Sequence, residues 1–218
     1  MATIPGGSYD VDFGTHRSDF INVADGNWFT FGRGGNDTIN GSDGNDVMFG
    51  GKGNDTLIGN DGFNTLFGDK GNDILLGGDS GNYLDGGKGK DILIGGDGND
   101  KLVGGADKDF MFGGDGHDQL VGGAGKDTMF GGEGNDTFVF SSGGGRDLVM
   151  DFEDGDILQI QRNINGLHLK NADDLSCRVR SDKDGNAVID LGRGDSITLV
   201  DVSADDVKAD PNSYIKLH

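Results

Sequence analysis

Ten aspartates recur at multiples of nine residues between residues 32 and 139, and each is the sixth residue of a nine-residue unit. They are Asp37, Asp46, Asp55, Asp73, Asp91, Asp100, Asp109, Asp118, Asp127 and Asp136. Calcium prefers about six to eight oxygen ligands, drawn from carboxylates and backbone carbonyls together. Carboxylates at a fixed period, each preceded by glycines, therefore predict a series of calcium sites.

Glycines at the second and fourth positions of the units are the second candidate group. Glycine reaches positive φ at little cost, which lets carbonyl oxygens turn towards an ion. The candidates are Gly35, Gly44, Gly51, Gly53, Gly71, Gly87, Gly89, Gly96, Gly98, Gly114, Gly116, Gly123, Gly125, Gly132 and Gly134. We expect a six-residue loop in each unit, followed by a three-residue strand.

The eighth position is apolar in all twelve units, from Ile39 to Phe138. Side chains alternate between the two faces of a strand, so this position should point inward and its neighbours outward. The third position is acidic in every even unit and never in an odd one, so the structural repeat is eighteen residues. We expect an all-β fold, a right-handed parallel β-roll of about six two-strand turns. Five gaps between loops on each edge would give up to about ten calcium ions.

Two units depart from the pattern, because Asn64 and Asn82 stand where aspartate is expected. Asparagine offers only a neutral oxygen. We therefore expect weakened calcium sites at these two loops, which are neighbours on the even edge.

The ends of the chain should cover the array. Asp19 and Ile21 align with the sixth and eighth positions, whereas Trp28 occupies an aspartate slot. The expected organisation is an N-terminal cap with degenerate repeats (1–31), the array (32–139) and a β-rich C-terminal cap (140–218). We expect cap strands near 148–152, 157–161, 177–181, 187–191 and 196–200, and short helices that begin after Asn171 and Ser203.

The formal net charge of −20 suggests that the array is disordered without calcium, because its carboxylates would repel. This acidity also argues against nucleic acid and anionic membranes as partners. There is no apolar run long enough to span a membrane, and no N-terminal signal peptide is recognisable. Because such loops need calcium at extracellular concentrations, we expect an extracellular protein, secreted without such a signal and with cell-surface association left open.

The repeats resemble those of RTX exoproteins, including serralysin-type proteases, RTX lipases, alginate epimerase modules and the adenylate cyclase toxin. The stretches 145–158 and 195–206 are similar to the C-terminal flank of that family. The resemblance implies that the flank caps the roll and carries a signal for type I secretion machinery. It also implies that each ion lies between two stacked loops, with Gly51, Gly53 and Asp55 facing the loop of Asp73. In the flank, Asp147 and Asp151 are candidate extra ligands.

We do not expect an enzyme, because the four histidines are scattered and no zinc-protease or lipase motif is present. Two alternatives stay open: the chain is the C-terminal portion of a secreted protease, lipase or epimerase, or it is an extracellular polysaccharide-binding module.

Outward positions on the odd strands are mostly apolar. They include Ile58, Ile74, Leu76, Ile92, Ile94, Phe110, Phe112 and Phe130. A contiguous apolar face usually marks an interface. We expect the C-terminal flank to fold back over it; the alternatives are a polysaccharide, a partner protein or a second copy of the chain.

Overall fold

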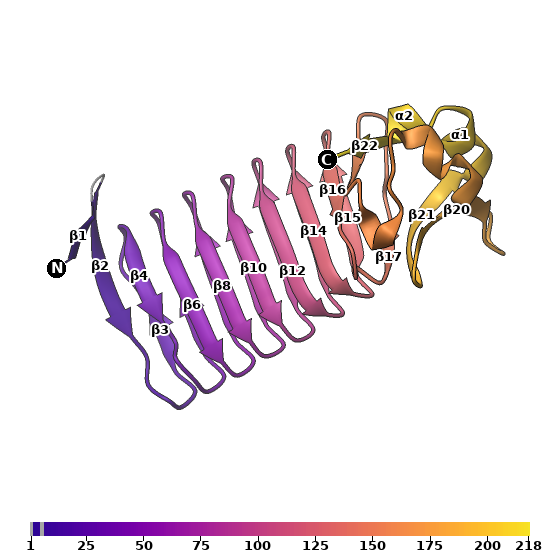
Figure 1. The fold of residues 1–218 in the computed structure, drawn as a ribbon. Coiled ribbons are helices and arrows are strands. Elements are labelled where there is room, and N and C mark those ends of the chain that lie inside the picture. Colours follow the sequence, from indigo (N-terminus) through magenta and orange to yellow (C-terminus); the bar gives the residue numbers. More distant parts are fainter. Residues whose placement is uncertain (1, 5–6) are drawn as a thin grey trace.

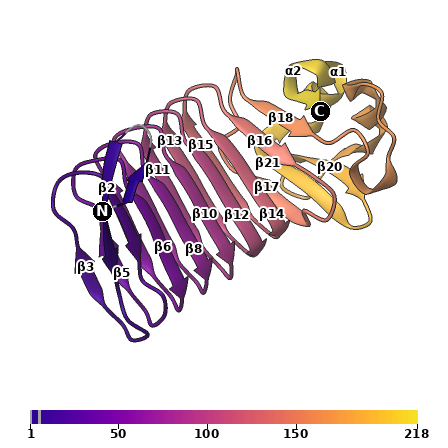
Figure 2. The ribbon, with the colours of Figure 1, turned by 60° about the vertical axis from the view of Figure 1, so that its left-hand side comes forward.

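The chain winds into a flattened coil whose successive strands alternate between two sheets (Figure 1). The computed structural model describes residues 2–4 and 7–218, with side chains described from residue 10 onward. Except at the two ends, neighbouring strands within a sheet are parallel and in register, as in the pairing of Leu57 with Leu75. Figure 2 shows the sheets as two facing layers with the loops along their edges.

One sheet, called here the even sheet, holds the strands of the even-numbered repeats. Its strands, in spatial order, are β1 (Ala2–Ile4), β2 (Gly7–Phe13), β4 (Trp28–Phe31), β6 (Val47–Lys52), β8 (Thr65–Lys70), β10 (Tyr83–Lys88), β12 (Lys101–Asp107), β14 (Gln119–Gly125), β16 (Thr137–Phe140), β18 (Ile157–Ile160) and β22 (Ile215–Leu217).

The other sheet, the odd sheet, holds the strands of the odd-numbered repeats. Its strands, in spatial order, are β3 (Phe20–Asn22), β5 (Thr38–Asn40), β7 (Thr56–Asn60), β9 (Ile74–Gly78), β11 (Ile92–Asp97), β13 (Phe110–Asp115), β15 (Thr128–Glu133), β17 (Arg146–Val149), β21 (Asp195–Ser203), β20 (Asn186–Gly192) and β19 (Val179–Ser181).

The core is a stack of eighth-position side chains between the sheets. All twelve, from Ile39 to Phe138, are fully buried, which confirms the predicted inward direction. Burying one leucine or isoleucine side chain stabilises a fold by about 1.5–3 kcal/mol. Since each turn adds only two such residues, the core alone is thin for a chain with 44 glycines.

The expected count of six turns is too low, because the coil has about eight. At the N-terminal end, β2 pairs in parallel with β4, and Ile21 stacks on Ile39. Trp28 keeps the slot of a sixth-position residue, since its backbone N–H donates to Asp46 Oδ1 at 2.8 Å. Strand geometry therefore continues beyond the residues that match the repeat pattern.

The C-terminal segment adds the short helices η1 (Ile164–Gly166), η2 (Ala172–Arg178), α1 (Ala204–Ala209) and α2 (Pro211–Tyr214). Two of them begin where the sequence predicted. Asn171 and Asp174 form a reciprocal capping box on η2, and the Ser203 hydroxyl accepts from the Asp205 N–H at the start of α1. No helix in the described part of the chain is long and apolar enough to span a membrane.

The expectation that this flank folds back over the apolar odd face is wrong. The flank lies at the end of the roll, where β18 pairs with β22 and β17 with β21 (Figure 1). The physical reason is that the last strand of each sheet presents unpaired backbone groups, which the flank satisfies. Outward side chains of the odd sheet such as Ile92 and Phe110 stay about 40% exposed.

Candidate metal centre

The ten sixth-position aspartates form two ladders, one along each edge of the roll. In each ladder Oδ1 accepts a hydrogen bond from the backbone N–H of the sixth-position residue one turn earlier. Asp73 accepts from Asp55, and Asp118 from Asp100, both at 2.7 Å. These bonds fix every carboxylate with Oδ1 along the roll axis and Oδ2 turned into the loop.

All ten Oδ2 atoms are buried and have no hydrogen-bond partner. Each lies close to the first glycine of its own loop. A Cβ built on Gly32 would lie 2.5 Å from Asp37 Oδ2 and also 2.5 Å from the carbonyl oxygen of Gly50, in the next loop along the edge. Carboxylate and carbonyl oxygens thus converge on one point that only glycine leaves open.

Such a cluster of acceptors without a donor fits a cation. Buried polar atoms are nearly always satisfied, so a regular series of unsatisfied anionic oxygens indicates a missing partner of positive charge. Within the described residues, no three His, Cys, Asp or Glu side chains gather around one point. A bound ion would therefore depend on carbonyls as well as carboxylates, which is the mixture that calcium accepts.

The second-position glycines of the predicted set lie inside strands, as Gly51 does in β6 and Gly96 in β11, so the strands are longer than the three residues expected. The fourth-position glycines other than Gly125 follow the strands in the loops, and every predicted glycine except Gly125 has a positive φ. At Gly53, with φ 127°, a Cβ would overlap the carbonyl oxygen of Gly35 in the preceding loop. Here the close stacking of loops, in addition to the backbone angle, requires glycine.

Asn64 and Asn82 continue the ladder but satisfy their own loops. Asp46 N–H donates to Asn64 Oδ1 at 2.9 Å, as it would to a carboxylate. The Asn64 Nδ2 occupies the place of the unsatisfied oxygen and donates to the carbonyl of Gly62 at 3.2 Å, with longer bonds to Asn60 and Asp61. The Asn82 Nδ2 likewise donates to the Ser80 carbonyl. An amide N–H group thus stands where a cation would otherwise balance these carbonyls.

Burial raises the pKa of the ladder aspartates. It brings Asp46, Asp73, Asp100 and Asp109 to about 7, while the backbone hydrogen bond from the previous turn acts in the opposite direction. The charged form is therefore disfavoured in the folded, metal-free state. A divalent ion would reverse this balance.

A second ladder, built by fifth-position side chains, runs in the opposite direction. Asn54 N–H donates to Asn36 Oδ1 at 2.9 Å. His117 takes part through its ring, because its Nδ1 accepts from Asn135 N–H at 2.9 Å. The one histidine of the array thus replaces an asparagine of this ladder.

The two aspartates proposed for the flank separate in the structure. Asp147 continues the odd-edge ladder, since its Oδ1 accepts from Asp127 N–H at 3.0 Å, and burial raises its pKa to about 8. Asp151 instead accepts hydrogen bonds from the backbone N–H groups of Gly131 and Gly132 at 2.9 and 3.0 Å. Both of its carboxylate oxygens are therefore satisfied by backbone groups, unlike the Oδ2 atoms of the ladder aspartates.

Asp156 is a ladder residue that the sequence analysis missed. Its Oδ1 accepts from Asp136 N–H at 2.8 Å, and its Oδ2 accepts from Glu153 N–H at 2.9 Å. The available signal was a spacing of twenty residues, which Asp156 shares with Asp147 relative to the last array aspartates. A search for aspartates at a period of eighteen residues does not find Asp156.

The match to a protein-family model agrees with this geometry. The model of the RTX calcium-binding nonapeptide repeat matches in overlapping segments from residue 31 to residue 149. No curated protein matches significantly. Among solved structures, the extracellular lipase LipA from Serratia marcescens has a TM-score of 0.38 and 19% identity, over 100% of this chain and 41% of that one. The chain thus spans less than half the length of LipA. Because the repeat model covers more than half of its residues, this calcium-binding β-roll belongs to the family of RTX calcium-binding nonapeptide repeat proteins.

Proposed function

We propose that this chain is a secreted β-roll whose activity is to fold on binding calcium outside the cell. One observation carries the proposal: ten buried carboxylate oxygens have no partner in the fold. Each unsatisfied buried group costs about 1–3 kcal/mol, and more when it is charged. The thin core does not offset so large a sum, so cation binding supplies the missing free energy.

The calcium affinity of such loops indicates where the chain folds, inside or outside the cell. Modules of this kind bind calcium at about 10⁻⁴–10⁻³ M, a concentration found outside cells. In the cytosol the chain would stay unfolded and could pass through an exporter. Calcium would then drive folding after export.

The test is circular dichroism of the full chain during a calcium titration from chelator to millimolar calcium. We expect disorder in chelator and a cooperative gain of β signal at high micromolar to millimolar calcium. Magnesium at the same concentration is the control, because its small octahedral shell suits carbonyl-rich sites poorly. A complete β signal in excess chelator would overturn the proposal.

The proposal extends to the flank and excludes catalysis. The similarity of 145–158 and 195–206 to RTX flanks supports a role in type I secretion. The dispersed histidines argue against a catalytic role for the chain. His117, the one histidine of the array, has a structural role in the fifth-position ladder. The role of the flank in type I secretion can be tested with a flank fusion. Its export by a host that has a type I exporter is compared with its export by the same host lacking the exporter.

A further inference from the structure

The outer face of the odd sheet carries two columns of apolar side chains that the rest of the described chain leaves open to solvent. They come from the seventh and ninth positions of successive odd repeats and lie in register, as Ile74, Ile92 and Phe110 do. From β7 to β15 the ten side chains of the two columns are apolar except for two threonines, and none is charged: Thr56, Ile58, Ile74, Leu76, Ile92, Ile94, Phe110, Phe112, Thr128 and Phe130.

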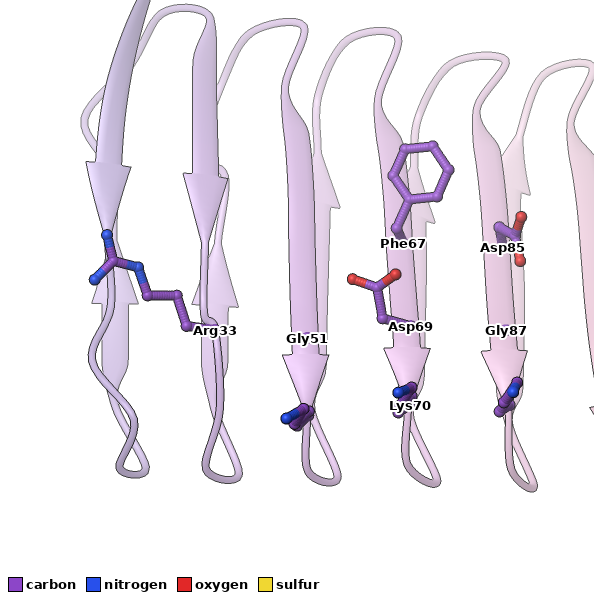
Figure 3. Close-up of a pocket in the computed structure, with 9 residues that line it drawn as sticks. Arg33, Gly51, Phe67, Asp69, Lys70, Asp85 and Gly87 are labelled. Carbon is purple, nitrogen blue, oxygen red and sulfur yellow. The ribbon is translucent and has the colours of Figure 1, made fainter.

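The outer face of the even sheet has a different character. Its outward side chains include Asp85, Lys101 and Gln119. A hollow of about 620 Å³ on that face is lined by lysines and aspartates together, among them Lys70 and Asp69 (Figure 3). Of the two sheets in the described chain, the odd one therefore offers the uninterrupted apolar surface.

The exposed area of the two columns suits a protein interface. Ile74, Ile92, Phe110 and Phe112 are each between 37% and 41% exposed. With their half-buried neighbours in the columns they present roughly 500 Å² of apolar surface, near the upper limit for a soluble monomer. A standard interface buries about 800 Å² on each partner, of which little more than half is apolar. The columns thus have the size of the apolar part of one side of such an interface.

Two rows of opposite charge border the columns. The basic row stands where the odd strands begin, two residues before each seventh position, and consists of Lys90, Lys108 and Lys126. The acidic row stands where the same strands end, and consists of the third-position residues Asp97, Asp115 and Glu133, which stack in register. All six side chains are exposed, and none forms an ion pair within the described residues.

The two rows belong to a general separation of charge between the edges of the roll. Of the eight lysines and arginines between residues 32 and 139, seven lie in the loops of the odd repeats, which precede the odd strands. The loops of the even repeats, which follow the odd strands, carry ten acidic residues and no lysine or arginine. The apolar face therefore lies between an edge that bears cations and an edge of acids.

We propose that the odd face binds a second copy of this chain, face to face, about a two-fold axis parallel to the roll axis. This rotation reverses the direction of the strands, so the edge where the odd strands begin in one copy lies over the edge where they end in its partner. The basic row of each copy then opposes the acidic row of the other, and the apolar columns pack together as in a sandwich of aligned sheets. A two-fold axis along the strands would instead place like charges opposite one another.

The character of the face favours a second copy over other occupants. A sugar chain needs hydrogen-bonding groups, and the two columns offer only the hydroxyls of Thr56 and Thr128. An anionic lipid surface would meet the acidic row of a chain whose net charge is −20. A copy of the same face supplies both the apolar area and the opposite charges, and one symmetric interface satisfies both partners. The inference goes beyond the proposed function, because it requires only the folded roll.

Sedimentation velocity of the full chain in saturating calcium measures this association. We expect a reversible monomer–dimer equilibrium with a dissociation constant of roughly 1–100 μM, because the apolar area is modest. Rising salt should weaken the dimer, since it screens the opposed rows. Unfolding measured at submicromolar chain reports on the monomer, in which Ile92 stays exposed.

The first variant tests the apolar columns. F110T/F112T removes two rings and introduces the residue that Thr128 already provides in register with Phe110. It should weaken the dimer by roughly tenfold or more. The matched control V103T/V121T removes apolar groups from the outer face of the even sheet, and should change the dissociation constant by less than about threefold.

The second set of variants tests the opposed rows. K90E/K108E/K126E should weaken the dimer by roughly tenfold or more, because acids would then face acids. Adding D97K/D115K/E133K to the same chain exchanges the two rows at constant net charge, and should bring the dissociation constant back to within about threefold of wild type. The control K52E/K70E/K88E makes the same change of net charge beside the even face, and should weaken the dimer by less than about threefold.

Three outcomes would overturn the inference: a folded wild-type chain that stays monomeric at about 0.1 mM, equal losses in F110T/F112T and V103T/V121T, or no recovery when the rows are exchanged. In the first case, binding of phosphatidylcholine vesicles or of a cello-oligosaccharide that F110T/F112T abolishes would assign the face to that ligand instead. Circular dichroism of every sample verifies that each variant is folded. Loss of the dimer with an unchanged β signal leaves calcium-driven folding intact, so the two proposals fail separately.

Discussion

The backbone N–H of Asn64 donates to Asn82 Oδ1 at 2.9 Å, so two neutral amides follow one another within the even-edge ladder. Each also turns its Nδ2 onto the carbonyls of its own loop. Everywhere else between Asp37 and Asp136, the corresponding atom is an unsatisfied carboxylate oxygen. Along this stretch of the edge, amide N–H groups therefore donate to the loop carbonyls.

The double variant N64D/N82D should bind more calcium ions than the wild-type chain, and its folding midpoint should move to lower calcium. Two carboxylates would replace the amides that now occupy the cation's place. Ion counting by equilibrium dialysis and circular dichroism measure the two effects. In chelator at neutral pH both chains should be disordered, so the difference should appear only during the calcium titration. An unchanged ion count would mean that carbonyls alone decide occupancy there.

Asp55→Ala and Asp100→Ala should differ. Asp55 lies on the odd edge with aspartates in both neighbouring turns, whereas Asp100 adjoins the Asn82 loop and accepts its backbone N–H. Loss of Asp100 should raise the calcium midpoint severalfold, and loss of Asp55 by less, in the same dichroism titration. Asp97→Ala, which removes an exposed acid outside the ladder, is the control and should have little effect. Equal shifts for the two ladder variants would contradict the independence of the two edges.

Lowering the pH should favour folding in the absence of calcium and oppose calcium-driven folding in its presence. Burial raises the pKa of ladder groups such as Asp73 and Asp109 to about 7 in the folded, metal-free roll, from an ordinary value of 3.8. A raised folded-state pKa contributes stability below the unfolded pKa, and this stability is lost as pH rises through the folded value. In chelator, β content should therefore increase between about pH 7 and pH 4. With calcium present, protons compete with the ion, so the calcium midpoint should rise over the same range. Parallel trends in both conditions would exclude this account.

Leu93→Ala should destabilise the calcium-loaded roll by about 2–5 kcal/mol, because Leu93 is fully buried between the sheets. Its neighbour Ile92 points outward and is 39% exposed, so Ile92→Ala is a matched control expected to cost under about 1 kcal/mol. Urea unfolding in saturating calcium gives both values. Comparable losses would mean that the apolar odd face is covered in solution.

The sequence alone determined the periodic part of this protein. A fixed interval of nine residues placed the inward side chain and the ladder residue of every turn between residues 32 and 139, because stacked identical units must repeat their contacts. It also identified Asn64 and Asn82 as exceptions, since a single residue type distinguishes them. The helix starts at Asn171 and Ser203 could also be predicted, because helix capping depends only on residues a few positions apart in the sequence.

Only the tertiary structure decided the features that depend on distant residues. Asp156 joined the even ladder because β18 stacks on β16, although an insertion had broken the period. The flank left the apolar odd face open because the ends of both sheets needed strand partners. Asn64 satisfies its own carbonyls because its loop folds around it, a contact that no spacing encodes. The hollow on the outer face of the even sheet that Phe67, Asp69 and Lys70 help to line (Figure 3) likewise depends on neighbouring turns, because Asp69 lies in register with Gly51 of the previous even strand.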